Sequence, residues 1–424
     1  MRLSRLLRAP ARPQFVLGFT FTALLLVAYF LYTFPTSFGA SASRYFSQTE
    51  PLDPAIARLQ QRAFTMGGIR PVCPLRDWHA ERYAGLSNSS NIFLAINFYN
   101  NEDVLPNFFQ ELPVMLKHLG PERVYVSIFE NGSTDQTQEM LGMLQRVLNI
   151  IGSPNTVVFG EPGETSRLPG HRIEILSRVR NKVLEPLYDG SAAEHVPRKR
   201  FDELLFMNDI SFCAADMLEL LYEKRTQHAN QVCSVDWMQS VVYDRWVLRD
   251  MRGKPFYRWE DVTFYYKWLP NPWTAGFSPP LRDSPKDRAR FENHLPLQVF
   301  SCWNGATVFD ADVFAAPDGI RFRMSHADIG EDGRPAAFSD KASECFLSSV
   351  DMWKAGRGKI MVVPKASVSY DAGHYRVHRK DYLMPPTDGR DKVIWEDKPP
   401  AQVAMQDYGF WWGPERWAPW DEQR

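Results

Sequence analysis

A ligand-binding turn is predicted at FENGSTDQT, residues 129–137, which follows the apolar run RVYVSI and precedes the amphipathic stretch QEMLGMLQRVL. Glu130 and Asn131 end the apparent strand, and Gly132 permits a tight turn. Ser133 can cap the helix that follows, since Ser133 and Gln136 fit the capping-box pattern. Such groups can hold a nucleobase or ribose, although a turn without any ligand would use the same residue types.

A buried cation is predicted in HRIEILSRVRNKVLEPLY, residues 171–188. A step of about 100° per residue places Arg172 and Arg180 on the apolar face of this helix. That face also carries Ile173, Leu176, Val179, Val183, Leu184 and Leu187. Burying a guanidinium without a partner costs several kcal/mol, so Arg180 should meet a carboxylate or a phosphate. A core ion pair and pyrophosphate binding both satisfy this requirement.

A divalent cation could bind where LLFMNDISF leaves a predicted buried strand. Asn208 and Asp209 emerge at the end of that strand, and one carboxylate with a neighbouring amide and a diphosphate is a workable shell for Mn²⁺ or Mg²⁺. His374, in SYDAGHYRV, could complete the shell. The alternatives that involve no metal are a helix cap at Asn208-Asp209 and a surface histidine at position 374.

Two acids, Asp340 and Glu344, lie four residues apart in SDKASECFLSS and would share one helical face. They are either solvated surface acids or catalytic carboxyls. The aromatic run at residues 257–273 is a candidate platform for an acceptor, and core packing would explain it equally well.

The elements that position these residues alternate between strand and helix from residue 91 onward. Predicted strands cover residues 91–99, 123–130, 155–160 and 201–210, and predicted helices cover 108–119, 133–151 and 171–188. This alternation predicts an α/β fold with a mainly parallel sheet that binds ligands at the carboxyl ends of its strands. Beyond residue 230 the alternation degrades, with a helix expected at 339–356 and a strand at 359–370.

The N-terminus predicts a membrane anchor. Four arginines within residues 1–12 precede the uncharged run Phe15 to Phe34, whose 20 residues would span a bilayer core of about 30 Å. Positive residues stay on the cytoplasmic side, which places the rest of the chain in a lumen or outside the cell. A cleaved signal peptide is the alternative.

The predicted organisation is therefore a cytoplasmic tail at 1–12, a transmembrane anchor at 13–34, a stem at 35–90 and a catalytic-type domain at 91–385. The Pro- and Trp-rich segment 386–424 would wrap the domain or form a lid. A net charge of -1 gives no support for a nucleic-acid partner.

Five cysteines without a CxxC pair allow up to two disulfides in an oxidising lumen, with one thiol left over. Glycosylation sequons begin at Asn88 and Asn131. We expect the second to stay unmodified, because it lies in the predicted turn.

Several motifs taken in order resemble a family of enzymes. The turn FENGSTDQT is similar to the nucleotide-binding turn of GT-A glycosyltransferases, and LLFMNDI stands where their metal-binding DxD motif ends a strand. NFYNNEDVLPNFFQEL, VDWMQSVVYDRWVLRDMRG, SCWNGATVFDADVF and SECFLSSVDMW extend the likeness over about residues 90–375. The chain resembles the fungal capsule-associated α-1,3-mannosyltransferases, glycosyltransferase family 69.

This resemblance implies a retaining transfer from GDP-mannose to a mannose-containing acceptor glycan, a divalent cation, and a single-pass type II Golgi membrane protein. Glu130 would contact the nucleoside, Arg180 the diphosphate and Asp209 the cation, with Asp340 or Glu344 near the acceptor hydroxyl or the anomeric carbon. The implied donor-binding residues are Asn97, Glu130, Asn131, Asp135, Arg172, Arg180 and Asn208. Asn208-Asp209 departs from a full DxD, so a single carboxylate would need a supplement such as His374.

Two alternatives share most of these features. A transferase that uses a UDP-sugar would differ only in its contacts to the base and the sugar. A catalytically silent lumenal glycan-binding or assembly protein would keep the sheet and lose turnover, and the incomplete DxD favours it.

Overall fold

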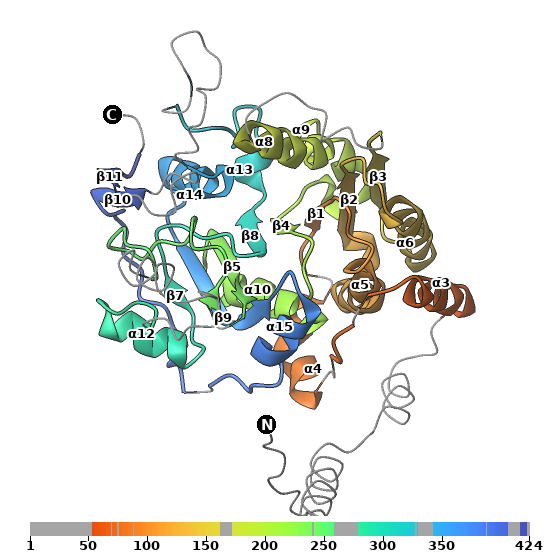
Figure 1. Ribbon diagram of the computed structural model, residues 1–424, viewed down its shortest axis with the longest axis horizontal. Helices are drawn as coiled ribbons and strands as arrows, with labels where there is room; N and C mark the ends of the chain where they lie inside the picture. The colour runs from red at the N-terminus through yellow and green to blue at the C-terminus, as the bar shows by residue number, and fades with distance from the viewer. Residues whose placement is uncertain are drawn as a thin grey trace, which may run out of the picture. The chain divides into compact units, whose positions relative to one another are not determined.

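A nine-stranded, mostly parallel sheet forms the centre of the computed structural model, in the strand order β3-β2-β1-β4-β8-β5-β9-β7 with β6 paired to β5 (Figure 1). The structure describes residues 53–421 except for 69, 74–75, 88, 162–171, 240, 258–278, 327–328, 330–341, 387 and 406–415. Its strands are β1 Ile92–Phe98, β2 Val124–Glu130, β3 Asn155–Phe159, β4 Glu203–Met207, β5 Gln231–Met238, β6 Val241–Val242, β7 Leu297–Gln298, β8 Ala306–Asp310 and β9 Ile360–Val368. A separate antiparallel hairpin joins β10 Gln402–Met405 to β11 Arg416–Pro419.

The parallel strands confirm the predicted α/β class. Strands β3, β2, β1 and β4 run parallel, whereas β8 lies antiparallel between β4 and β5. Every residue of β4 and β9 is buried, as expected for strands covered on both faces. The four strands predicted before residue 230 and the one predicted at 359–370 are all present.

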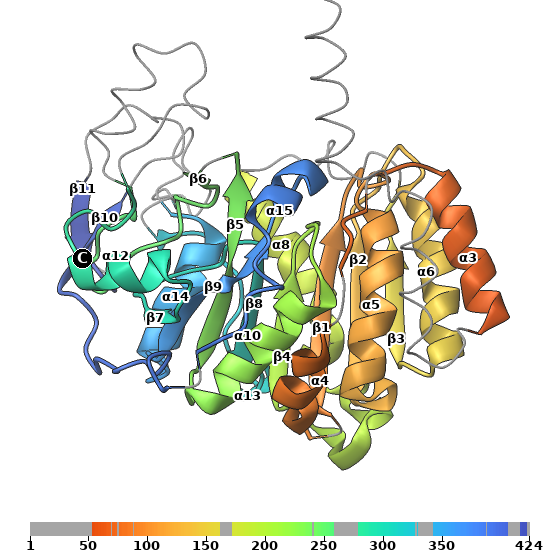
Figure 2. The same cartoon turned by 90° about the horizontal axis from the view of Figure 1, so that it is seen from below.

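Helices cover both faces of this sheet (Figure 1). Helices α8, α9, α13 and α14 lie on one face, and α5, α6 and α10 lie on the other. Their bounds are α5 Leu105–Leu119, α6 Thr137–Ile151, α8 Arg172–Val183, α9 Glu185–Tyr188, α10 Ala214–Thr226, α13 Asp312–Ala315 and α14 Glu344–Lys354. Helix α12, Pro285–Glu292, packs near β7. Helix α15, Ala372–His378, lies at the end of the sheet where β5 finishes (Figure 2).

Described residues between Ala55 and Leu86, within the predicted stem, contact the helices that flank the sheet. Gln60 of α3, Pro54–Thr65, donates a hydrogen bond to the carbonyl of Phe109 at 2.6 Å. Tyr83, the last residue of α4 at 77–83, is fully buried and its hydroxyl donates to Glu219 Oε2 at 2.7 Å. These contacts bury side chains that a free stem would leave in solvent.

The predicted tail and anchor, residues 1–34, lie outside the described residues. Among the helices that the structure does describe, none has both the length and the apolar character required to cross a membrane.

Two helices begin later than predicted. Helix α6 begins at Thr137, because Asp135 Oδ1 accepts the Thr137 amide at 3.0 Å and turns the chain just before it. The predicted capping role of Ser133 is wrong, since its hydroxyl instead accepts the amide of Asn100 at 2.8 Å. Helix α14 begins at Glu344, and Asp340, which was predicted to share a helical face with it, lies outside the described residues.

Two disulfides join distant parts of the chain, Cys73–Cys213 and Cys233–Cys302, and leave Cys345 as a buried thiol. The first ties the segment before the sheet to the start of α10. The second ties β5 to the segment before β8, so both disulfides hold elements around the central strands.

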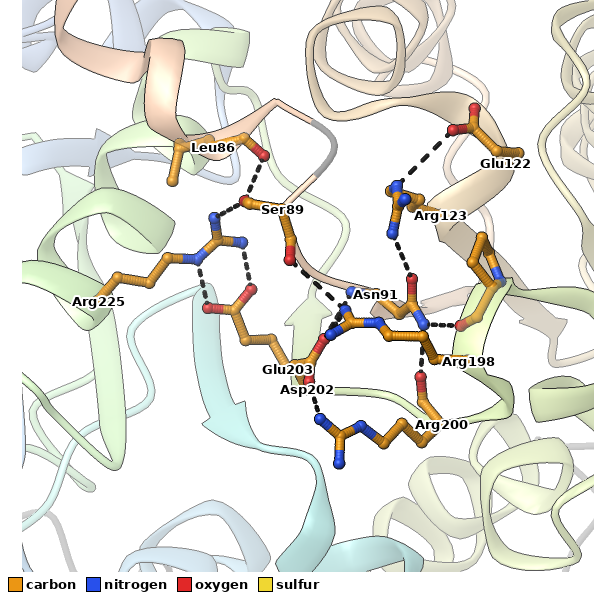
Figure 3. Close-up of polar contacts among 11 residues, drawn as sticks. Leu86, Ser89, Asn91, Glu122, Arg123, Arg198, Arg200, Asp202, Glu203 and Arg225 are labelled. Carbon is orange, nitrogen blue, oxygen red and sulfur yellow. Dashed lines mark hydrogen bonds and ion pairs between the residues drawn. The ribbon is translucent and has the colours of Figure 1, made fainter.

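Ion pairs hold the amino end of the parallel strands together (Figure 3). Arg225 makes a bidentate contact to Glu203 at the start of β4, with N–O distances of 2.6 and 2.9 Å. Arg198 contacts Asp202 at 2.8 Å, and the amide of Asn91 donates to the same carboxylate at 2.8 Å. The amino edge of the sheet is therefore held by structural ion pairs, whereas the predicted ligand-binding residues lie at the opposite, carboxyl edge.

Candidate functional site

The carboxyl end of β4 places Asn208 and Asp209 beside the start of β8. The amide of Asn208 donates to the carbonyl of Gly305 at 2.8 Å, which fixes the chain at this point. Gly305 has a φ of 83°, and a Cβ there would come within 2.8 Å of a Val368 methyl group. A glycine is therefore required where these segments approach one another.

Arg180 occupies the centre of this edge and reaches it from α8. Its Nε donates to Glu344 Oε1 at 2.9 Å, and its Nη1 donates to Asn208 Oδ1 at 3.2 Å. The guanidinium also lies 4.3 Å from the Trp303 ring centroid. The side chains of Arg180 and Glu344 are only 12% and 2% exposed, which confirms the prediction of a buried, partnered arginine. The partner is a carboxylate, and phosphate binding stays a prediction.

The side-chain amide of Asn208 is fully used by neighbouring residues. Its Oδ1 accepts from Arg180 and from Trp303 Nε1 at 3.1 Å, and its Nδ2 donates to the Tyr370 hydroxyl at 2.7 Å. A cation at Oδ1 would lie against a guanidinium and displace these donors. In this conformation Asn208 orients Arg180, and its predicted role in a metal shell stays a prediction.

Asp209 is the acid that fits a divalent cation at this edge. Burial raises the pKa of Asp209, while the amide of Asn101, which donates to its Oδ2 at 2.7 Å, opposes that rise. Protein-bound Mg²⁺ usually keeps several waters and is held by one or two carboxylates together with a ligand's phosphates, so one protein carboxylate is a sufficient anchor. The residues present thus fit a cation held mainly by a ligand's phosphates.

His374 gains no support as a second metal ligand. Its ring Nδ1 lies 3.8 Å from Asp371 Oδ1, and its amide donates to the same oxygen at 2.8 Å. Over the part of the chain that the structure describes, the three-donor grouping of His, Cys, Asp or Glu lies at Cys73, Glu111 and Cys213. Those two cysteines form a disulfide, so that grouping is not a metal site.

The turn at residues 129–137 is built largely by its own acids. Glu130 is fully buried, its Oε1 accepts the amide of Ser133, and its Oε2 accepts the Gln138 amide at 2.7 Å. Each oxygen accepts one hydrogen bond inside the turn and the side chain is fully buried, so the contact of Glu130 to a nucleoside stays a prediction. Gly132 has a φ of 83°, which confirms the predicted tight turn. Asn131 is 9% exposed, and its amide donates to the carbonyl of Phe98 at 3.0 Å.

The remaining predicted donor-binding residues lie in three places. Asn97 is the last residue but one of β1 and donates to the carbonyl of Val179 at 3.1 Å, while its Oδ1 is buried without a partner among the described residues. That oxygen is an available acceptor beside Arg180.

Asp135 accepts the amides of Glu102 and Thr137 and so shapes its own turn. Arg172 is exposed at the start of α8, because the apolar face begins only at Ile173.

Sequence reasoning did not identify a further pair of acids at this edge, Asp236 and Asp244. Asp236 lies near the end of β5 and is fully buried, and Asp244 follows shortly after β6. Burial raises the pKa of Asp236 to about 6 and, together with the charge of Asp236, that of Asp244 to about 7. The signal was an acid after the apolar run QVCSV, the same pattern that pointed to Asp209.

This edge therefore combines a held guanidinium, a carboxylate suited to a cation, and a second pair of acids. A guanidinium and a cation stabilise a leaving diphosphate, and acids can hold hydroxyl groups. The predicted aromatic platform at 257–273 lies outside the described residues except for Tyr257.

Comparison with known proteins gives a consistent family match. Residues 91–351 match the family described as Cryptococcal mannosyltransferase 1. Alpha-1,3-mannosyltransferase CMT1 of Cryptococcus neoformans is 30% identical over 397 residues, which cover 84% of this chain and 81% of that relative.

Solved structures give a weaker likeness. TarS of S. aureus is 10% identical with a TM-score of 0.35, and the similar region covers 66% of this chain and 60% of TarS. The mannosyltransferase PcManGT from Pyrobaculum calidifontis, in complex with GDP-Man and Mn²⁺, is 12% identical with a TM-score of 0.34. That match covers 74% of this chain and 67% of PcManGT.

Proposed function

Because the chain belongs to the Cryptococcal mannosyltransferase 1 family and is a glycosyltransferase, we propose that it transfers mannose from GDP-mannose to an acceptor glycan. The proposed product is an α-1,3-linked mannoside formed with retention, on a GT-A-type domain. The observation that carries this proposal is the grouping of Arg180, Asn208 and Asp209 at the carboxyl edge, within the matched residues 91–351.

In the proposed reaction, the acceptor hydroxyl oxygen bonds to C1 of mannose, the bond from C1 to the β-phosphate oxygen breaks, and GDP leaves with that electron pair. The hydroxyl proton passes to a base. Arg180 would contact the diphosphate through the guanidinium edge that Glu344 and Asn208 leave open. Its fixed charge would stabilise the negative charge that develops on GDP.

Glu344 acts in this proposal as a positioning residue. Its carboxylate is almost fully buried and already bonded to Arg180, so it holds the guanidinium rather than attacking the sugar. When bound, a divalent cation such as Mn²⁺ or Mg²⁺ would add positive charge at the diphosphate, and Asp209 is the residue that would hold it. Asn97 Oδ1 would accept a hydrogen bond from the donor substrate, GDP-mannose.

We further propose that the domain lies in the Golgi lumen behind a type II anchor at residues 13–34. The two disulfides support an oxidising compartment, because such bonds are rare in the cytosol. In microsomes that carry the full chain, a C-terminal tag should resist added protease until detergent is present, and Asn88 should accept a glycan. Digestion of the tag without detergent would refute this orientation.

A donor screen tests the proposed activity. The purified full-length chain in detergent would be incubated with GDP-mannose, UDP-glucose or UDP-N-acetylglucosamine, with Mn²⁺ or Mg²⁺ and a panel of mannosides. Among these donors, we expect only GDP-mannose to yield GDP and a mannosylated product. If a UDP-sugar is turned over instead, that UDP-sugar is the donor and GDP-mannose is not. If no donor is turned over, the proposed function is refuted.

A further inference from the structure

The turn after β5 brings an exposed aromatic ring and two acids together beside Arg180. Strand β5 pairs with the two-residue strand β6, and the chain then folds back so that the amide of Tyr243 donates to the carbonyl of Asp236 at 2.9 Å. The next amide, that of Asp244, donates to Asp236 Oδ1 at 3.2 Å. Asp236 thus fixes where both residues lie, Tyr243 through its backbone carbonyl and Asp244 through its side chain.

Asp236 is held on one oxygen and unsatisfied on the other. Its Oδ1 also accepts from Asn304 Nδ2 at 2.8 Å. Its Oδ2 is buried and has no hydrogen-bond partner among the described residues, although Asp236 is 0% exposed. Leaving a buried polar atom unpaired is costly, so this oxygen indicates a partner that the described residues do not supply.

The turn is joined to the proposed donor site through Tyr370. The rings of Tyr243 and Tyr370 meet edge to face at 5.1 Å, and the Tyr370 hydroxyl accepts from Asn208, which also holds Arg180. Asn304, which binds Asp236, directly precedes Gly305, whose carbonyl accepts the Asn208 amide. Two residues, Tyr370 and Asn208, therefore link this turn to Arg180, the residue assigned to the diphosphate.

An exposed tyrosine ring next to hydrogen-bonding acids suits a sugar. Tyr243 is 41% exposed, so its ring is accessible to the C–H face of a pyranose. Carboxyl oxygens accept hydrogen bonds from hydroxyl groups, and their charge disfavours a second anion nearby. The chemistry therefore fits a neutral pyranoside better than a uronic acid.

We propose that Tyr243 and Asp244 form the acceptor subsite, in which Tyr243 stacks on a neutral pyranoside, Asp244 binds its hydroxyl groups, and Asp236 positions both residues. This inference rests on the proposed function, because it identifies the acceptor side of the same site.

The test separates acceptor binding from donor binding. For the full-length chain, the acceptor KM would be measured with methyl α-mannopyranoside. Binding at the donor side would be measured as the Kd for GDP, the nucleotide part of the donor. Tyr243→Ala should raise the acceptor KM about three- to tenfold, since aromatic contacts contribute about 0.5–1.5 kcal/mol. Asp244→Asn should raise it by at least as much, and neither variant should change the Kd for GDP by more than about twofold.

Tyr243→Phe keeps the ring and should keep the acceptor KM near that of the wild type. Tyr382→Ala is the matched control, because Tyr382 is 48% exposed and lies outside the proposed site. Thermal unfolding identifies any variant that fails to fold. If the wild type transfers mannose but Tyr243→Ala and Asp244→Asn leave the acceptor KM unchanged, the subsite is wrong and the proposed function stands. If the wild type neither binds GDP nor transfers mannose, the proposed function itself fails.

Discussion

Replacing Arg180 with lysine distinguishes a core ion pair from a diphosphate ligand. Arg180 makes two charge-assisted contacts, Nε to Glu344 at 2.9 Å and Nη1 to Asn208 at 3.2 Å. A lysine ammonium keeps the charge but cannot reproduce a planar fork with an open edge. Arg180→Lys should therefore lose one protein contact and the bidentate approach to phosphates.

The expected magnitudes follow from these contacts. A hydrogen bond to a charged group contributes about 1.5–3 kcal/mol, so the free energy of unfolding should fall by about 2 kcal/mol and Tm by a few degrees. Loss of a bidentate phosphate contact should weaken donor binding by about 1–3 kcal/mol, which is roughly 5- to 150-fold in Kd. Both changes are measurable on one purified variant by thermal unfolding and by calorimetric titration with GDP-mannose.

Two further variants separate the contributions. Arg225→Lys breaks a comparable bidentate pair with Glu203 at the opposite edge of the sheet, so it should lower Tm without changing donor Kd. Glu344→Gln keeps an acceptor for Arg180 Nε but removes the negative charge that holds the guanidinium, so it should lower Tm and weaken donor binding less than Arg180→Lys does. If Arg180→Lys lowers Tm as Arg225→Lys does and leaves donor Kd unchanged, Arg180 is only a structural residue and the proposed donor site is wrong.

Two other predictions concern carboxyl groups. Asp209→Asn should reduce transfer at least about a hundredfold, equivalent to roughly 2.7 kcal/mol, and EDTA should abolish wild-type transfer; a variant with near wild-type rates would refute the cation role. Burial raises the pKa of Asp216 from 3.8 to about 8, so the folded state keeps a proton that the unfolded chain releases. The free energy of unfolding should therefore fall as the pH rises from about 4 to 8, and Asp216→Asn should weaken this dependence in urea titrations; an unchanged pH profile would contradict the raised pKa.

Much of the sheet could be predicted from the sequence, because buried parallel strands read as apolar runs. Since parallel strands end at one edge, the position of Asn208 and Asp209 at that edge could be predicted as well, whereas the approach of Arg180 depends on how α8 packs. The pairing of Arg180 with Glu344 joins residues 164 positions apart, and no local pattern encodes it. The helix boundary at Glu344 was missed although Ser343, a suitable cap residue, precedes it.

The second acid pair escaped prediction for a topological reason. Strand β8 is inserted antiparallel between β4 and β5, so the strand and helix alternation that guided the first half no longer holds. The disulfides join cysteines 140 and 69 residues apart, and only the tertiary fold brings them together. The occupied oxygens of Glu130 are likewise visible only in three dimensions.

The most direct test of the central claim is the product of a single reaction. The full-length chain would be incubated with Mn²⁺, GDP-mannose carrying ¹³C in the sugar, and methyl α-mannopyranoside, and the labelled product would be examined by NMR. We predict a new α-anomeric signal from a mannose attached at O3 of the acceptor, together with an equal amount of GDP. A β-anomeric product, or labelled mannose released only as free sugar, would contradict a retaining α-1,3-mannosyltransferase.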